Sequence, residues 1–297
     1  MSPEQVFGWL NVHKPSGPTS HDVVAMVRRG TGVRKVGHAG TLDPMADGVL
    51  VLCLGPATRL SAYAMRAPKR YRARVRLGVT TDTYDAQGRV VEERSAEHLT
   101  PGQVEAALDA FRGEIKQVPP MYSALKREGR RLYNLARDGQ EVPRDPRPVA
   151  IYHLALTAFE RPFLTLDVEC SPGTYIRSLA HDLGRALGVG GHLVQLTRVS
   201  SGAFHLDDAV SWDELRAAMA DGSWKGYMLP PDVPLAGLPA VMLGAAEAGR
   251  VRHGQAIPAP LEAAGEARAY DPAGRLLAIL NARDGQWQPV TVFLGAD

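Results

Sequence analysis

The sequence predicts a protein of the α+β class, in which a large domain of intermingled strands and helices precedes a small β-rich domain. Residues 71–79 alternate between basic side chains and mostly apolar ones, which is the pattern of a half-buried strand. Helix-capping signals recur between the strand patterns, and a proline-rich segment near residue 230 precedes a run of short strands. With 297 residues, the chain is long enough to bury a core in each of two domains.

The first elements are a short strand at 8–12 and a helix that follows a turn-rich segment. Thr19 or Ser20 can cap the start of this helix, and Gly30 and Gly32 can end it. Its apolar residues are Val23, Val24 and Val27. These signals predict a helix with one apolar face.

A glycine-rich loop at 37–48 is the stretch around which the rest of the chain is organised. It contains three glycines and His38, and Asp43 is followed by Pro44, shortly before the apolar run 49–54. Glycine permits positive φ, and proline biases the preceding residue away from the α region, so the loop can fix Asp43 in an unusual conformation. A carboxylate at the mouth of a buried strand fits a functional site and also fits a tight turn, and the loop alone does not decide between them.

The strand at 71–79 has a basic outer face, formed by Arg72, Arg74 and Arg76. The other elements predicted for the large domain are, in order, a turn at 85–88, a strand at 89–93, a helix with a capping box at 100–103, an irregular segment at 118–125, a basic helix at 130–137, paired strands at 149–159 and 163–170, a helix after the turn at 171–173, a strand at 193–204 and a helix with a capping box at 211–214.

The proline-rich linker at 230–238 predicts a boundary between a first domain at 1–229 and a second domain at 239–297. The second domain is expected to contain a helix near 244–251 and strands at 267–270, 275–281 and 288–293, with a hairpin turn at 271–274. Short strands of this kind predict a small β-barrel-like appendage.

Charge is distributed unevenly along a chain whose net charge is only +2. Six cationic residues and no acid occur at 66–76, and a second cationic stretch occurs at 126–147. Clustered basic segments favour a polyanionic partner such as nucleic acid, although either stretch alone fits a solvated face.

The chain lacks an apolar run of transmembrane length, and its N-terminal residues do not resemble a signal peptide. Cys53 and Cys170 lie in apolar strand patterns without a CxxC motif, which predicts reduced, buried thiols. We therefore expect a cytoplasmic protein that does not contact a membrane.

Common catalytic and cofactor motifs are absent from the sequence: GxxxxGK[ST], GxGxxG in a strand–helix context, HExxH and GxSxG. The sequence therefore predicts neither a metal nor a cofactor. Taken singly, Asp43 fits a turn residue, Arg177 a solvent-exposed helix residue, and Tyr71 and Tyr175 core aromatics.

The order of these residues along the chain resembles the TruB family of tRNA pseudouridine synthases. The similar blocks are 14–17, 37–50, 69–71, 77–83, 119–126, 170–179 and 188–196. The resemblance runs from about residue 8 to residue 205, and the tail is similar, more weakly, to the family's PUA-like RNA-binding domain. It implies the pseudouridine synthase fold: a mixed, largely antiparallel central sheet flanked by helices.

The resemblance also implies a function, which is isomerisation of uridine 55 in the T-loop of tRNA without a cofactor. Asp43 would be the nucleophile, acting on C1′ or C6 of a flipped-out uridine, with Arg177 as its ion-pair partner. Tyr71 would stack on the base and assist proton removal, while Tyr175 and Leu196 line the pocket.

Further contacts with the substrate would come from His38 and Lys14. The candidate phosphate track consists of Arg72, Arg74, Arg76, Arg130, Arg131 and Arg137. The partner would be the T-arm of tRNA, with the C-terminal domain extending towards the acceptor stem, and the protein is expected to be a monomer.

The sequence departs from the family pattern at Ala39, Asp47 and Val51, where Thr, Thr and Pro are expected. Asp47 adds a second acid beside Asp43, which would raise the pKa of Asp43 if the two were close. A non-catalytic RNA-binding or tRNA-folding role is the rival reading, and a folding role can coexist with catalysis. The set of Asp43, Tyr71, Tyr175 and Arg177 favours the enzyme. A synthase working within a ribonucleoprotein is less favoured, because the chain lacks long terminal extensions.

Overall fold

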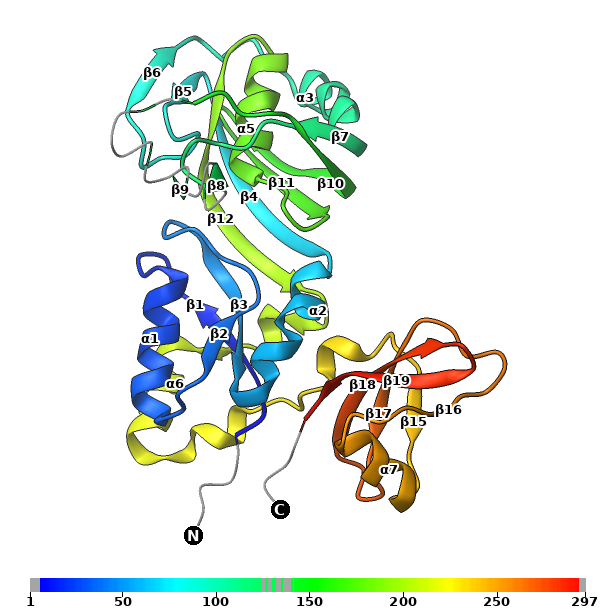
Figure 1. The fold of residues 1–297 in the computed structure, drawn as a ribbon. Helices are drawn as coiled ribbons and strands as arrows, with labels where there is room; N and C mark the ends of the chain where they lie inside the picture. Colours follow the sequence, from blue (N-terminus) through cyan, green and yellow to red (C-terminus); the bar gives the residue numbers. More distant parts are fainter. Residues whose placement is uncertain are drawn as a thin grey trace.

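The computed structural model describes residues 6–123, 126–127, 130–131, 135, 140 and 142–293, and at 126–127 and 130–131 it describes the backbone alone. A ten-stranded sheet with the order β14-β1-β3-β12-β4-β11-β10-β7 runs through the larger part of the molecule, with β2 beside β3 and β13 beside β12 (Figure 1). Its strands are β1 (Gly8–Lys14), β2 (Val36–His38), β3 (Asp47–Leu54), β4 (Lys69–Leu77), β7 (Gly113–Gln117), β10 (Arg147–Glu160), β11 (Phe163–Cys170), β12 (Gly191–Ser201), β13 (Phe204–His205) and β14 (Val210–Ser211).

This sheet is mixed and largely antiparallel, which confirms the predicted fold class. Within it, β1 pairs with β14 and β3 with β12 in parallel, while the other described pairs are antiparallel. Two short hairpins lie outside it: β5 (Val79–Thr81) with β6 (Val90–Glu93), and β8 (Lys126–Arg127) with β9 (Arg130–Arg131). The prediction of a helix from residue 130 is therefore wrong at its start, because Arg130 and Arg131 pair as a strand, and Arg137 lies outside the described residues.

The described helices are α1 (Ser20–Thr31), α2 (Ser61–Arg66), α3 (Pro101–Leu108), α5 (Ile176–Ala186), α6 (Trp212–Asp221) and α7 (Ala245–Arg252), with short 3-10 helices at Gly55–Leu60, Asp109–Phe111, Leu206–Asp208, Ser223–Tyr227 and Val233–Leu235. The capping boxes predicted for α3 and α6 are present. For α1, Thr19 is the cap, and its hydroxyl accepts the N–H of Asp22. The hydroxyl of Ser20 instead donates to the carbonyl of Leu42 and accepts the N–H of the same residue.

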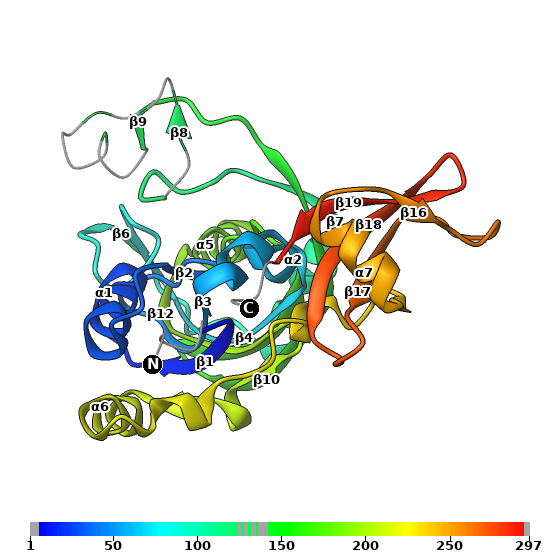
Figure 2. The same ribbon diagram turned by 60° about the horizontal axis from the view of Figure 1, so that its bottom comes forward.

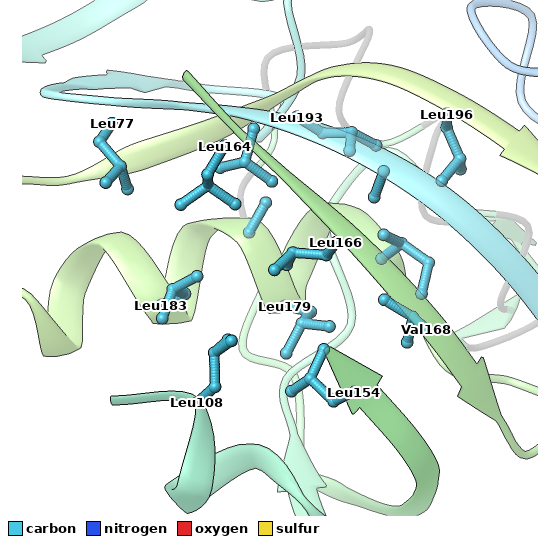
Figure 3. Close-up of a cluster of buried hydrophobic side chains, with 14 of the residues drawn as sticks. Leu77, Leu108, Leu154, Leu164, Leu166, Val168, Leu179, Leu183, Leu193 and Leu196 are labelled. Carbon is cyan, nitrogen blue, oxygen red and sulfur yellow. The ribbon is translucent and has the colours of Figure 1, made fainter. Parts of the chain in front are cut away.

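One half of the sheet buries its core against α5. Leucines and a valine from β4, β11 and β12 face the helix, and Leu179 and Leu183 point back at them (Figure 3). Burying each such side chain contributes about 2 kcal/mol. The pattern of β4 places its arginines on the other face, which no described helix of this half covers. In the other half, α1 and α6 pack on β1 and β3.

The C-terminal domain is a five-stranded sheet with the order β15-β17-β18-β19-β16 and one helix, α7 (Figure 2). Its strands are β15 (Ala240–Met242), β16 (Ile257–Pro258), β17 (Glu266–Tyr270), β18 (Leu276–Arg283) and β19 (Gln286–Val292). The helix, three strands and the turn predicted here are confirmed, while β15 and β16 were not predicted.

Side chains from both domains hold this sheet against the first domain. The rings of Phe7 and Phe293 are 4.9 Å apart, and the hydroxyl of Tyr63 donates to Glu266 at 3.0 Å. Arg59 donates to the carbonyl of Val292 at 2.7 Å. The C-terminal domain is therefore attached by specific contacts as well as by its connecting segment.

Candidate active site

The loop between β2 and β3 presents Asp43 at the edge of the α5 core. Leu42 and Ala46, on either side of it, are buried in that core, whereas the Asp43 side chain is 35% exposed. The carbonyl of each residue from Gly40 to Met45 accepts a hydrogen bond within the protein. A loop whose successive carbonyls are all hydrogen-bonded has little freedom to move, so Asp43 is held in place before any substrate binds.

Two buried cations donate hydrogen bonds to this loop. Lys14 is fully buried, and its Nζ donates to the carbonyls of Pro15 and Pro18 and, at 3.4 Å, of Pro44. Arg198, on β12, donates to the carbonyls of Gly40, Thr41 and Val49. The Lys14 side chain thus contacts protein backbone here, and its predicted contact with substrate stays a prediction.

The close approach of β3 to β12 requires a glycine at position 48. Its φ is +104°, and a Cβ atom there would lie 2.3 Å from the carbonyl oxygen of Arg198. The register pairs Gly48 with Arg198, so the absence of a side chain allows this arginine to reach the loop.

Arg177 joins Asp43 to a second carboxylate. Its Nε lies 2.9 Å from Oδ2 of Asp43, although the N–H is not aligned for a hydrogen bond, and its Nη1 lies 3.3 Å from Oδ2 of Asp85. The guanidinium also donates to the carbonyls of Thr83 and Tyr122. Because the Arg177 side chain is only 5% exposed, it acts in a medium where charges are poorly screened. The predicted Asp43–Arg177 pair is therefore present.

The Asp43 charge affects the pKa values of two partly buried tyrosines, Tyr71 and Tyr175. Burial raises the pKa of Tyr71, Arg198 opposes this shift, and the Asp43 carboxylate adds a smaller increase. Burial also raises the pKa of Tyr175, again with a contribution from Asp43. Both phenols are consequently neutral at physiological pH, a state suited to packing against a base.

Asp47 lies near two basic side chains, Lys14 and His13. Burial lowers the pKa of Lys14 to about 8, and Asp47 opposes this shift more strongly than Asp43 does. Asp47 also has Oδ2 at 3.9 Å from Nε2 of His13. The acid that departs from the family pattern therefore lies close to a buried lysine and to a histidine.

The remaining predicted pocket residues are His38 and Leu196. His38 is half-buried on β2, and burial, followed by the nearby Arg198, lowers its pKa, so the ring is neutral at pH 7. Leu196 is buried beside Ala73 of β4 in the α5 core.

Arg72, Arg74 and Arg76 of β4 lie on the opposite face of the sheet from Tyr71. Arg74 stacks on Phe163 with its guanidinium carbon 4.6 Å from the ring centre. A groove of about 400 Å³ runs there, lined by Arg72, Arg74, Ala158, Glu160, Phe163, Leu164, Thr165, Gln195 and Thr197. The phosphate track predicted from these arginines is thus on a different surface from the Asp43 site. The side chains of Arg130, Arg131 and Arg137 lie outside the described residues.

Sequence reasoning missed Arg198 and Asp85. An arginine inside the apolar strand 193–204 was a usable signal, because a charge in a buried strand needs partners. Asp85 was assigned to a turn, a role that it also has, since its Oδ1 accepts the N–H of Gln87.

The site can supply an ionisable carboxylate held by a guanidinium, beside neutral aromatic rings. This set suits nucleophilic chemistry on an electrophilic carbon. In the described part of the chain, no three His, Cys, Asp or Glu side chains form a cluster that could hold a metal ion. Cys53 and Cys170 are buried as predicted, and burial raises the pKa of each thiol to about 11.

Three family models together match most of the chain. Residues 28–176 match the N-terminal domain of the TruB family pseudouridylate synthases, and residues 177–236 match the tRNA pseudouridylate synthase B C-terminal domain. Residues 238–294 match the C-terminal model of tRNA pseudouridine synthase II.

Whole-chain comparisons agree with these models. The tRNA pseudouridine synthase B of Symbiobacterium thermophilum is 52% identical over 255 residues, covering 85% of this chain and 83% of the relative. The enzyme of the same name from Dehalococcoides mccartyi is 45% identical, with 97% of this chain and 96% of the relative covered. Among solved structures, a Cbf5-Nop10-Gar1 complex matches with a TM-score of 0.74 at 27% identity, over 97% of this chain and 84% of that chain.

The fold and these matches define a pseudouridine synthase, an enzyme that isomerises uridine in RNA. The chain belongs to the TruB family and is a tRNA pseudouridine synthase. Over the described residues, the helices are too short or too polar to cross a membrane.

Proposed function

We propose that this enzyme forms pseudouridine at position 55 in the T-loop of tRNA, with Asp43 as its nucleophile. The observation that carries the proposal is the ion pair between the partly exposed Asp43 carboxylate and the buried Arg177 guanidinium. The buried guanidinium lies beside the carboxylate oxygen and fixes its position, and a carboxylate oxygen can act as the nucleophile. The loop backbone holds this carboxylate in position, so little reorganisation is needed when uridine enters.

The reaction rearranges one bond without an external reagent. Asp43 attacks C1′ of the ribose or C6 of the base, the N1–C1′ bond breaks, and the uracil rotates within the pocket. C5 then bonds to C1′, and the bond to Asp43 breaks with its electron pair returning to the carboxylate. The proton on C5 leaves and N1 gains a proton, so product and substrate have the same atoms and the enzyme is regenerated. No electron acceptor or group carrier is required, and we propose that the enzyme uses no cofactor.

The surrounding side chains receive roles that fit their contacts. Tyr71 stacks on the uracil as a neutral ring, while Tyr175 and Leu196 complete the wall of the pocket. His38 contacts RNA near the flipped uridine. Lys14 supports the loop through the carbonyl of Pro44 and adds positive charge near the substrate.

Recognition of the T-arm is proposed to depend on shape, with the PUA-like C-terminal domain contacting the acceptor stem. The bacterial relatives named for tRNA are more similar than the Cbf5 complex, which supports tRNA as the substrate. We propose that the enzyme acts as a monomer in the cytoplasm. RNA bound to Arg72, Arg74 and Arg76 has to pass round the edge of the sheet, because these side chains face away from Tyr71.

Tritium release from transcribed tRNA labelled at C5 of uridine tests this proposal. We expect Asp43→Asn to abolish release while tRNA affinity stays within about tenfold, because binding of the ground state does not require the nucleophile. A tRNA with cytidine at position 55 should release no tritium from the wild-type enzyme. Near-normal turnover by Asp43→Asn would refute the nucleophile, and release from the cytidine-55 tRNA would refute the position.

A further inference from the structure

Two side chains one turn apart on α5 contact two consecutive residues of the loop after β5. Arg177 pairs with Asp85, with Nη1 3.3 Å from Oδ2. His181 stacks on Tyr84, with ring centres 3.9 Å apart and planes 16° from parallel. Residues four apart lie on the same face of a helix, so α5 holds this loop at two neighbouring points.

Tyr84 has a backbone conformation that needs support from its surroundings. Its φ is +64°, in the left-handed region that residues with a Cβ atom rarely adopt. Its carbonyl accepts the N–H of Leu193 on β12 at 3.0 Å, and its N–H donates to the carbonyl of Thr81 at 3.3 Å. Such a conformation persists only where neighbouring contacts over-determine it, and the His181 ring is the helix's contribution.

The conformation of Tyr84 sets the direction of the next side chain. Asp85 is 5% exposed, and its Oδ1 accepts hydrogen bonds from Thr83 Oγ1 and from the N–H of Gln87, both within the same loop. Those bonds fix the carboxylate within the loop and do not fix the loop on the helix. Arg177 itself bonds to the loop, at Asp85 and at the carbonyl of Thr83, and the stack is the attachment to α5 that does not involve Arg177. With the stack in place, the Asp85 carboxylate faces Arg177.

We propose that the Tyr84–His181 stack positions Arg177 for catalysis by holding Asp85 against it. The inference rests on the proposed role of Asp43, because the last link is the Arg177–Asp43 ion pair. In this scheme neither ring touches the uridine, so both are positioning residues. The ring of His181 is neutral at physiological pH, since burial lowers its pKa, and it adds no charge beside the guanidinium.

A double-mutant cycle with His181→Ala and Tyr84→Ala tests the proposal. Loss of one stacked pair should lower the single-turnover rate on tRNA by about two- to tenfold, while tRNA affinity stays unchanged. The double variant should be no slower than the slower single variant, because the rings act only through each other. Hydrogen exchange at the amides of Ala86 and Leu193, which bond across this loop, should quicken.

Variants that keep a ring separate positioning from folding. His181→Phe and Tyr84→Phe should restore the rate, and Phe204→Leu is the matched control, because it removes a ring contact with Trp9 at 5.9 Å elsewhere in the core. Unchanged rates in both alanine variants, multiplicative losses in the double variant, or losses that phenylalanine does not restore would overturn the inference. If Asp43→Asn is inactive while His181→Ala turns over normally, the stack proposal alone fails. If Asp43→Asn is active, the proposed function fails.

Discussion

Arg198 offers the sharpest test of how the loop around Asp43 is held. Replacing it by Met keeps the length of the side chain and removes the donors to Gly40, Thr41 and Val49. Three hydrogen bonds at about 1 kcal/mol each amount to about 3 kcal/mol of stability. The loss is not fully recovered by water, because the Arg198 side chain is 2% exposed.

Urea denaturation and tritium release would measure the two consequences of Arg198→Met. We expect the free energy of unfolding to fall by about 3 kcal/mol, and the single-turnover rate to fall more than tenfold in conditions where the variant is folded. Arg198→Lys should recover part of the stability, since one ammonium group cannot reach both sides of the loop.

Arg28→Met is the control for Arg198→Met, because Arg28 donates to the carbonyl of Val36 from an exposed position. It should change stability by about 0.5 kcal/mol or less. Wild-type stability and turnover in Arg198→Met would refute the argument. A stability loss with normal turnover in the folded variant would show that the loop does not need this clamp to position Asp43.

Two other groups make measurable differences in stability and in RNA binding. Burial lowers the pKa of Lys14 to about 8 from 10.5, so between those values the unfolded chain binds a proton that the folded chain does not, and this group's contribution to stability rises with pH. Urea denaturation at pH 8 and 10.5 should show wild type gaining stability relative to Lys14→Met. Arg72→Ala should weaken tRNA binding and reduce the slope of log affinity against log salt by about one, in filter-binding titrations, if the β4 face contacts phosphate.

For each of these two predictions, one experimental result would refute it. A constant stability difference between wild type and Lys14→Met across that pH range would mean that the buried lysine does not titrate there. An unchanged salt slope in Arg72→Ala, with Arg72→Lys as the charge-retaining control, would remove the β4 face from the RNA path.

Local patterns predicted most of the fold because each depends on neighbours in sequence. The alternation from Tyr71 onward predicts β4, since a half-buried strand requires one apolar face. The strand ends at Leu77, just before Gly78, whose φ is +87°. The capping boxes at Thr100 and Ser211 are equally local. The parallel strand β15 was missed because its three residues acquire their meaning only by pairing with β17.

The site could be predicted only in part. Glycines and a proline around Asp43 pointed to a stiff loop, whereas the pairing of Arg177 with Asp43 came from a family resemblance and not from any spacing. The roles of Asp85 and His181 could not be predicted from the sequence, because only folding brings the loop after β5 beside α5. Contacts between distant segments have no signature in the periodicity of either segment.

The position of Asp47 follows from the charge of the groups beneath the loop. Among the described residues, the hydrogen bonds of Lys14 and Arg198 go to backbone carbonyls. Burial lowers the pKa of Lys14, and the nearby Arg198 charge lowers it further. Asp47 is the largest opposing influence on the pKa of Lys14. It therefore keeps Lys14 more protonated at neutral pH, and a protonated Lys14 donates to the carbonyl of Pro44, the residue after Asp43. An acid four residues from Asp43 thus acts on the support of the loop.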